Sequence, residues 1–152
     1  MVLSRSFSPP GSYMKDSDGY APPTHGGVVA IKAATIEYTD VAAKTLFILP
    51  AGAVPLDWWF DVGTDFDAGT NNNLDIGAAG TADYFANDVA IGTQGLFRAG
   101  VANSVDGRLG VQFDEDTTIT ATYIPSGTSP TTGSGIFFMT YMMQNTEDFT
   151  VD

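Results

Sequence analysis

Few residues in this chain could carry acid–base or metal chemistry. His25 is its only histidine and lies between Pro22-Pro23-Thr24 and Gly26-Gly27, far in sequence from any acidic cluster. A Ser-His-Asp triad could use no other histidine, and the sequence contains no Gly-x-Ser-x-Gly motif. It also contains no cysteine, which excludes a disulfide framework and a thiolate metal site. We therefore expect no enzyme activity and no cofactor.

A stretch rich in Asp and Asn offers oxygen ligands for a calcium ion. Five such side chains fall within eleven residues around Gly69, namely Asp65, Asp67, Asn71, Asn73 and Asp75. Their spacing departs from that of an EF-hand loop, and the bidentate Glu at the twelfth position of such a loop is missing. Asp and Asn are also favoured in turns, because their side chains bond the nearby backbone. We interpret the stretch as a polar loop and expect no metal.

A second acidic group, Asp114-Glu115-Asp116, has the composition of a glycosidase carboxylate pair. It stands between two predicted strands, where a tight hairpin needs polar residues. Like charges at that place also discourage edge-to-edge pairing of strands. A solvated turn is the interpretation that we favour.

Three adjacent aromatic residues, Trp58-Trp59-Phe60, form the densest aromatic cluster. In a strand, Trp58 and Phe60 point to one face and Trp59 to the other. One set should enter the core. The side chain or side chains on the opposite face are either covered or exposed. If covered, they lie in the core or at a subunit contact. If exposed, they form a platform that stacks on sugar rings. We favour the covered arrangement.

The composition predicts one soluble, all-β domain. The chain has 152 residues, 43% of them hydrophobic and 16% charged, with seventeen Gly and eight Pro. Its net charge of -12 lies entirely in residues 28–152, since the first 27 residues carry two basic and two acidic side chains. Such an acidic surface argues against binding to nucleic acid and to anionic membranes. We find no signal peptide or membrane-spanning run, and we expect synthesis in the cytoplasm.

Short apolar runs separated by Gly, Pro, Asn and Asp predict an antiparallel β-sandwich over residues 28–152. Only Ala82–Val89 and Asn103–Asp106 admit a helical turn. About eight short strands in one domain fit a jelly roll. The candidate strands are Val28–Ile31, Thr35–Tyr38, Lys44–Leu49, Val54–Val62, Leu74–Ile76, Gly95–Ala99, Leu109–Phe113, Thr117–Ile124 and Ile136–Met143.

The last of these strands is apolar on both faces. Phe137, Met139 and Tyr141 share one face, and Ile136, Phe138, Thr140 and Met142 share the other. Such a strand is either central in its sheet or covered by another subunit. We assign Phe137, Met139 and Tyr141 to a contact with another subunit or with a partner protein.

Residues 1–27 are predicted to form an extended N-terminal arm. Pro9-Pro10-Gly11 and Pro22-Pro23 prevent both a helix and a continuous ladder. Large side chains nevertheless recur along it, including Phe7, Tyr13 and Tyr20. Aromatic residues on an extended segment suggest anchors that dock on a neighbour. The alternative is an arm folded back on its own sandwich.

The segment Leu46–Gly77 resembles a known family. It contains a strand that ends in Leu-Pro-Ala-Gly-Ala, an Asp-Phe-Asp-Ala-Gly-Thr loop and an Asn-x-Leu-Asp-Ile-Gly strand. This combination resembles the small β-proteins encoded beside the major capsid gene of tailed bacteriophages, which are head decoration, or cement, proteins of jelly-roll type. The resemblance covers roughly Ala34 to Met142.

This resemblance implies a virion protein on the outer surface of an icosahedral head, which clamps adjacent major capsid protein subunits and stabilises the capsid. It also implies a homo-oligomer, either a dimer or a trimer, with the major capsid protein as partner. Two other functions remain open: a component of the phage tail or fibre tip, and a carbohydrate-binding β-sandwich module.

Overall fold

The computed structural model describes residues 28–105 and 108–143, which form a β-sandwich without any α-helix in those ranges. The eight strands are β1 (Val28–Glu37), β2 (Lys44–Leu49), β3 (Ala53–Thr64), β4 (Asn71–Ala78), β5 (Thr81–Ala90), β6 (Gly95–Arg98), β7 (Thr117–Ser126) and β8 (Ser134–Met143). The predicted all-β fold is confirmed.

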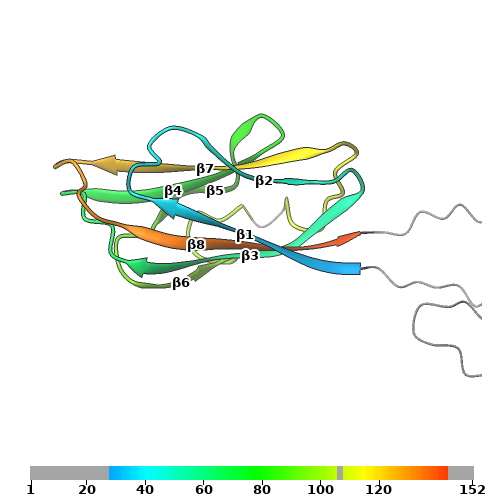
Figure 1. Cartoon of the computed structure of the whole chain (residues 1–152), viewed down its shortest axis with the longest axis horizontal. Helices are drawn as coiled ribbons and strands as arrows, with labels where there is room; N and C mark the ends of the chain where they lie inside the picture. Colours follow the sequence, from blue (N-terminus) through cyan, green and yellow to red (C-terminus); the bar gives the residue numbers. More distant parts are fainter. Residues whose placement is uncertain (1–27, 106–107, 144–152) are drawn as a thin grey trace, which may run out of the picture.

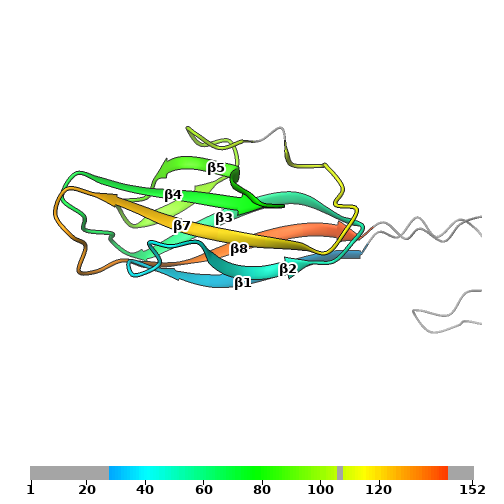
Figure 2. The same ribbon diagram turned by 90° about the horizontal axis from the view of Figure 1, so that it is seen from above.

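The strands form two four-stranded sheets that pack face to face (Figures 1 and 2). One sheet has the order β1-β8-β3-β6 and the other the order β2-β7-β4-β5, and every pair is antiparallel. Consecutive strands β1, β2 and β3 therefore alternate between the sheets. This order is that of an eight-stranded jelly roll.

The core lies between the sheets and is rich in aromatic side chains. Trp58 of β3 stacks on Phe137 of β8, with ring centroids 6.1 Å apart. At one end of the sandwich the buried ring of Phe66 packs between Phe60 and Tyr123. The largest fully buried side chains come from both sheets, the loop after β3 and the residue after β5: Trp58, Tyr123, Phe60, Phe66, Phe85, Phe137, Ile36, Leu49, Leu74, Ile76, Ile91 and Ile119.

Three sequence predictions of secondary structure are wrong. Val28–Ile31 and Thr35–Tyr38 are predicted as separate strands, but the single strand β1 runs from Val28 to Glu37. Ala82–Val89 was expected to admit a helical turn but lies within strand β5. Leu109–Phe113 was expected to be a strand but is a turn followed by irregular chain. Its last residue does make two strand-like hydrogen bonds, because the amide of Phe113 donates to Ala53 O and its carbonyl accepts from Gly52 N.

The group Asp114-Glu115-Asp116 consequently does not join two strands of a hairpin. It forms a bend that leads into β7, and its three side chains are exposed. The carboxylate of Asp116 accepts a hydrogen bond from Ala51 N at 2.9 Å. This contact ties the bend to the turn between β2 and β3.

Lysine side chains close the side of the sandwich where β1 and β2 are both edge strands. Lys32 donates to Ile48 O at 2.6 Å. Lys44 donates to Thr35 O at 3.0 Å and pairs with Asp40 at 2.8 Å. Each lysine thus satisfies a carbonyl on the opposite sheet, which protects two edges that could otherwise pair with other chains.

The first and last described residues leave from the same end of one sheet. Val28 opens β1 and pairs with Met143, which closes β8 (Figure 1). The segments 1–27 and 144–152 are therefore attached to neighbouring strands. The predicted arm, with Phe7, Tyr13 and Tyr20, lies outside the described residues.

Candidate interaction surface

The outward face of the β1-β8-β3-β6 sheet is apolar. Alternation along each strand turns every second side chain of this sheet away from the core. The apolar residues among them, which we call the apolar face, are Val29, Ile31, Ala33, Trp59, Leu96, Ile136, Phe138 and Met142. Thr35, Thr140, Asp57, Asp61 and Arg98 also point outward on this sheet. Four residues of the apolar face are large and well exposed: Val29 (61%), Leu96 (60%), Ile31 (55%) and Ile136 (44%).

Strand register brings these side chains into contiguous rows. Ala33 pairs with Phe138, and Phe138 pairs with Trp59. The rings of Trp59 and Phe138 stack 5.4 Å apart at 17°. In the next row, Asp61 stands between Ile136 on one side and Leu96 on the other. An aromatic pair thus lies among aliphatic side chains on an open sheet surface.

Charged groups stand beside and among these apolar side chains, and Arg98 is the cross-strand partner of Trp59. Asp57 of β3 pairs with Arg98 of β6 at 3.8 Å. Asp61 and Glu37 are exposed near the other end of the same face. Neither carboxylate forms an ion pair within the described part of the chain. One end of the apolar face is therefore acidic.

The outward face of the other sheet is polar by comparison. Strand β7 turns Thr118, Thr120 and Thr122 outward, and β4 turns Asn73 and Asp75 outward. Burial raises the pKa of the Asp75 carboxyl above its usual value, and the nearby charges of Asp88 and Asp83 add to the effect. The two faces of the sandwich thus differ sharply in polarity.

The side chains assigned from the sequence to a subunit contact are in the core. Phe137 and Met139 are fully buried, and Tyr141 is 8% exposed. That assignment is corrected, because the opposite sheet of the same chain already covers these three residues. The outward side of β8 instead carries Ile136, Phe138 and Met142. Both sides of the strand are apolar, so the sequence alone could not tell which side faces out.

The aromatic triplet is divided as its alternation predicts. Trp58 and Phe60 are buried in the core. Trp59 lies on the opposite side of β3, partly exposed beside Phe138. It is therefore the one member of the triplet that stands on an open surface.

Asp67 joins two loops at one end of the sandwich. Its carboxylate accepts hydrogen bonds from the Thr131 hydroxyl at 2.6 Å, the Thr131 amide at 2.7 Å and the Thr132 amide at 3.0 Å. The hydroxyl bond of Thr131, followed by the two amide bonds, lowers the pKa of Asp67 to about 2. The loop after β3 is thereby tied to the loop before β8.

The other two carboxylates considered as calcium ligands also accept hydrogen bonds from the protein backbone. Asp65 accepts from Gln94 N at 2.6 Å, and Asp75 accepts from Asp88 N at 2.6 Å. Across residues 28–105 and 108–143, no three acidic or histidine side chains gather as a metal site would require. The oxygen atoms of this stretch thus serve mainly to connect loops and strands.

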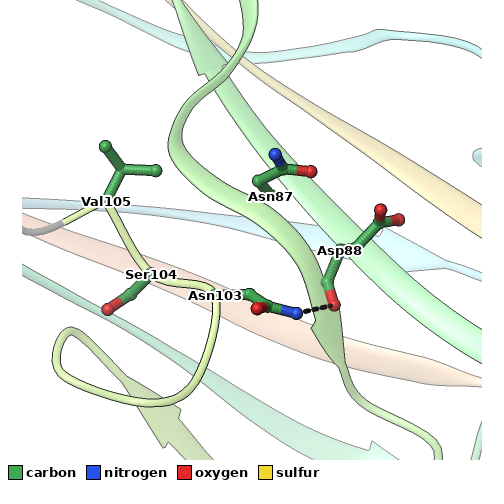
Figure 3. A pocket seen from close by; sticks show the side chains of 5 residues that line it. All are labelled: Asn87, Asp88, Asn103, Ser104 and Val105. Carbon is green, nitrogen blue, oxygen red and sulfur yellow. Dashed lines mark hydrogen bonds between the residues drawn. The ribbon is translucent and has the colours of Figure 1, made fainter.

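A polar hollow of about 300 Å³ lies beside the end of β5 (Figure 3). It is lined by Asn87, Asp88, Asn103, Ser104 and Val105. Asp88 and Asn103 both have positive φ, at 55° and 69°, which these residue types tolerate better than most. The Asn103 side chain donates to Asp88 O at 3.1 Å. The hollow is shaped by this local connection between β5 and the chain that follows β6.

Within the described ranges, no helix is long and apolar enough to cross a membrane. No protein-family model matches the chain. No curated protein matches it in sequence either. Similarity is found among solved structures.

Three phage capsid structures contain chains that are similar to this one. A chain of the cyanophage Pam1 capsid asymmetric unit is 21% identical, with a TM-score of 0.61 over 88% of this chain and 99% of that one. A chain of the acid-stable capsid of Helicobacter pylori bacteriophage KHP30 is 14% identical, with a TM-score of 0.60 over 79% and 90%. A chain of the Ralstonia phage GP4 capsid is 17% identical, with a TM-score of 0.53 over 82% and 89%. The shared feature is the fold, over 79–88% of this chain and 89–99% of the other chains.

Proposed function

We propose that this protein is a structural component of a tailed-phage virion that binds the outer surface of the icosahedral head and stabilises it. In this role it clamps adjacent major capsid protein subunits as a decoration, or cement, protein. The observation that carries the proposal is the fold shared with chains of three phage capsid structures, which extends over 89–99% of those chains.

The surface of the sandwich supports a role in an assembly. Monomeric soluble proteins rarely expose a large contiguous apolar patch, and patches of this kind usually mark interaction sites. Here half of the large exposed apolar side chains of the described residues gather on one sheet, and the other sheet is rich in Thr, Asn and Asp. Such a polarity difference suits a protein with one face on a shell and the other in solvent.

The first test locates the protein within the virion. Antibody raised against the purified protein, followed by gold labelling of intact particles, should place label over the head. Quantitative mass spectrometry of the same particles should give many copies per virion. Label confined to the tail would contradict the proposal and support a tail or fibre-tip component.

Residues 1–27 are part of the proposal as a docking arm that uses Phe7, Tyr13 and Tyr20. The support is their aromatic content and their attachment to β1, beside the end of β8. Deletion of residues 1–27 should leave the melting temperature unchanged and abolish binding to purified heads. Binding by the truncated protein at wild-type affinity would contradict the arm hypothesis. Sedimentation of the intact protein would establish whether it is the expected dimer or trimer.

We also propose that the protein is not an enzyme and needs no metal. In support, the Asp65–Asp75 carboxylates already accept hydrogen bonds from backbone amides of the described chain. Calcium would have to displace these donors. Melting curves in EDTA and in millimolar calcium should therefore superimpose. A calcium-dependent rise in melting temperature that disappears in Asp67→Asn would contradict this prediction.

A carbohydrate-binding module is the second candidate, because Trp59 stacks on Phe138 at an open surface. An aromatic pair of this kind could accept a sugar ring. Quenching of Trp59 fluorescence by host surface glycans, absent in Trp59→Ala, would support this candidate. No quenching across a glycan panel would leave the virion role as the better explanation.

A further inference from the structure

The apolar face is not covered by any element of the described chain. Half of the eight large apolar side chains that are exposed in the described ranges lie on it. It extends across β1, β8, β3 and β6, with the stacked pair of Trp59 and Phe138 near its middle. An aromatic centre among aliphatic residues has the composition typical of an interface core.

The charge around this face points to a partner of opposite charge. Asp61 and Glu37 are exposed at one end and form no ion pair among the described residues. The four basic side chains of the described ranges are already engaged. Lys32 and Lys44 bond carbonyl groups, Arg98 pairs with Asp57, and Arg108 lies 4.7 Å from the Tyr84 ring centre. Within residues 28–105 and 108–143, no basic side chain is therefore left unengaged to balance these carboxylates.

A second copy of the chain fits this face poorly. It would bring the same unbalanced carboxylates and a net charge of -12 of its own. Four strands of at most about ten paired residues give a face of roughly 600 Å², from ~3.3 Å per residue and ~4.8 Å between strands. Any contact through this face alone would bury at most roughly 1,200 Å², the lower end of stable interfaces, so the charge balance decides between a second copy and another partner.

We infer that the apolar face docks on the surface of the phage head shell, at a site that is apolar at its centre and lined with Lys or Arg at its rim. The inference rests on the proposed function, and it specifies which side of the sandwich meets the shell. Trp59, Phe138, Ile31 and Ile136 supply the central contact. Asp61 and Glu37 meet the basic rim, which sets the orientation of the sandwich.

The central contact is tested with a matched pair of variants and heads that lack the protein. The double variant Ile31→Thr/Ile136→Thr keeps β-branched residues and removes exposed apolar groups. The control Ile48→Thr makes the same change on the other sheet, at a side chain that is 50% exposed. In co-sedimentation, the double variant should bind heads at least about tenfold more weakly, and the control should bind like wild type. Circular dichroism and melting verify that all three fold.

The basic rim is tested with Asp61→Asn and with salt. Wild-type affinity for heads should fall as the salt concentration rises from about 50 mM to about 500 mM, because salt screens the attraction between exposed charges. Asp61→Asn should weaken binding at low salt and show a smaller dependence on salt. Affinity that is independent of salt, or unchanged in Asp61→Asn, would overturn the charged part of the inference.

The outcomes separate this inference from the proposed function. Failure of the wild-type protein to bind heads would contradict the proposed function itself. Wild-type binding that the double variant retains would overturn the inference and leave the proposed function standing. If the wild-type protein is a dimer, and the double variant is a monomer that still binds heads normally, the apolar face is the contact between two copies of the chain. If acrylamide quenches Trp59 fluorescence more strongly after deletion of residues 1–27, the arm covers the apolar face in the intact protein. Either result would overturn the inference.

Discussion

At the scale of single residues, the polar loop side chains act as connectors of the fold. The Asp67 carboxylate bonds three donors on the loop before β8, and the amide oxygen of Asn72 accepts from Ala68 N and from the Tyr123 hydroxyl. The Asn72 side chain also donates to Ala68 O at 3.2 Å. These contacts keep the loop after β3 against the end of the sandwich, where Phe66 is buried.

The pH dependence of stability should report the Asp67 contacts. The folded-state pKa of Asp67 is about 2, below its ordinary value of 3.8. The carboxylate therefore contributes stability above the ordinary value, and this contribution is lost as the pH falls through about 2. Asp67→Asn should lower the urea midpoint at pH 7, and the difference from wild type should close between about pH 4 and pH 2.

The control for this prediction is Asp114→Asn, which removes one charge at an exposed position of the bend before β7. It should have the same urea midpoint as wild type at pH 7. A pH-independent difference between Asp67→Asn and wild type would show that the carboxylate charge is not what matters.

Gly77 of β4 is needed because a side chain has no room there. A Cβ at this position would lie 2.6 Å from Thr120 Oγ1, 2.7 Å from Thr81 O and 2.8 Å from Ala82 O. Gly77→Ala should therefore cost about 1–3 kcal/mol in the free energy of unfolding, as overpacking of a core does. Gly63→Ala in β3 is the matched control, since nothing lies within 4 Å of its Cβ. Equal urea midpoints for the two variants would contradict the crowding at Gly77.

At the scale of elements, the two sides of strand β8 have different roles: the buried side contributes to stability, and the outward side is expected to contribute to binding. Phe137 is fully buried and contacts Phe47 and Trp58. Phe138 points outward and stacks on Trp59. Phe137→Ala should cost about 3–5 kcal/mol in the free energy of unfolding. Phe138→Ala should cost less, because its ring is only partly buried, and should weaken binding to heads.

Denaturant unfolding and head co-sedimentation of the two variants test this separation. Phe137→Leu provides a folded variant with a less disturbed core, and it should bind heads normally. Loss of binding in Phe137→Leu together with normal binding in Phe138→Ala would contradict the assignment of the two sides.

Alternation predicted several elements well and failed where polar residues interrupt it. The strands at Lys44–Leu49, Thr117–Ile124 and Ile136–Met143 lie where the sequence places them. Strand β5 was missed because its register with β4 shifts twice and Asp88 adopts a positive φ. Leu109–Phe113 has a strand-like composition, but it makes only isolated hydrogen bonds to the start of β3 and to the turn before it.

The same limit applies to the candidate site. The sequence predicted that β8 would be apolar on both sides, and that one of Trp58 and Trp59 would face the core. Which side of β8 faces out depends on the position of the β2-β7-β4-β5 sheet, because its core residues cover Phe137 and Met139. Pairing between distant strands thus decides the composition of the apolar face, and no local pattern contains that information.

At the scale of the whole molecule, the sandwich has two unlike faces and a strong acidic charge. Its net charge is -12, and the described basic residues are engaged within the chain. The free protein should therefore stay soluble despite an exposed apolar face. On a shell with many equivalent sites, a contact of only a few kcal/mol per copy, roughly, would be multiplied many times. The two unlike faces and the acidic charge are therefore consistent with the proposed role in stabilising an assembly.

The most direct measurement of that role is DNA release from heads on heating. Heads from a phage that lacks the gene should assemble, but should release DNA at a lower temperature than wild-type heads, as followed with a DNA-binding dye. Addition of the purified protein should restore the wild-type release temperature, and addition of the Ile31→Thr/Ile136→Thr variant should not. Wild-type heat resistance in particles verified by mass spectrometry to lack the protein would contradict the proposed function.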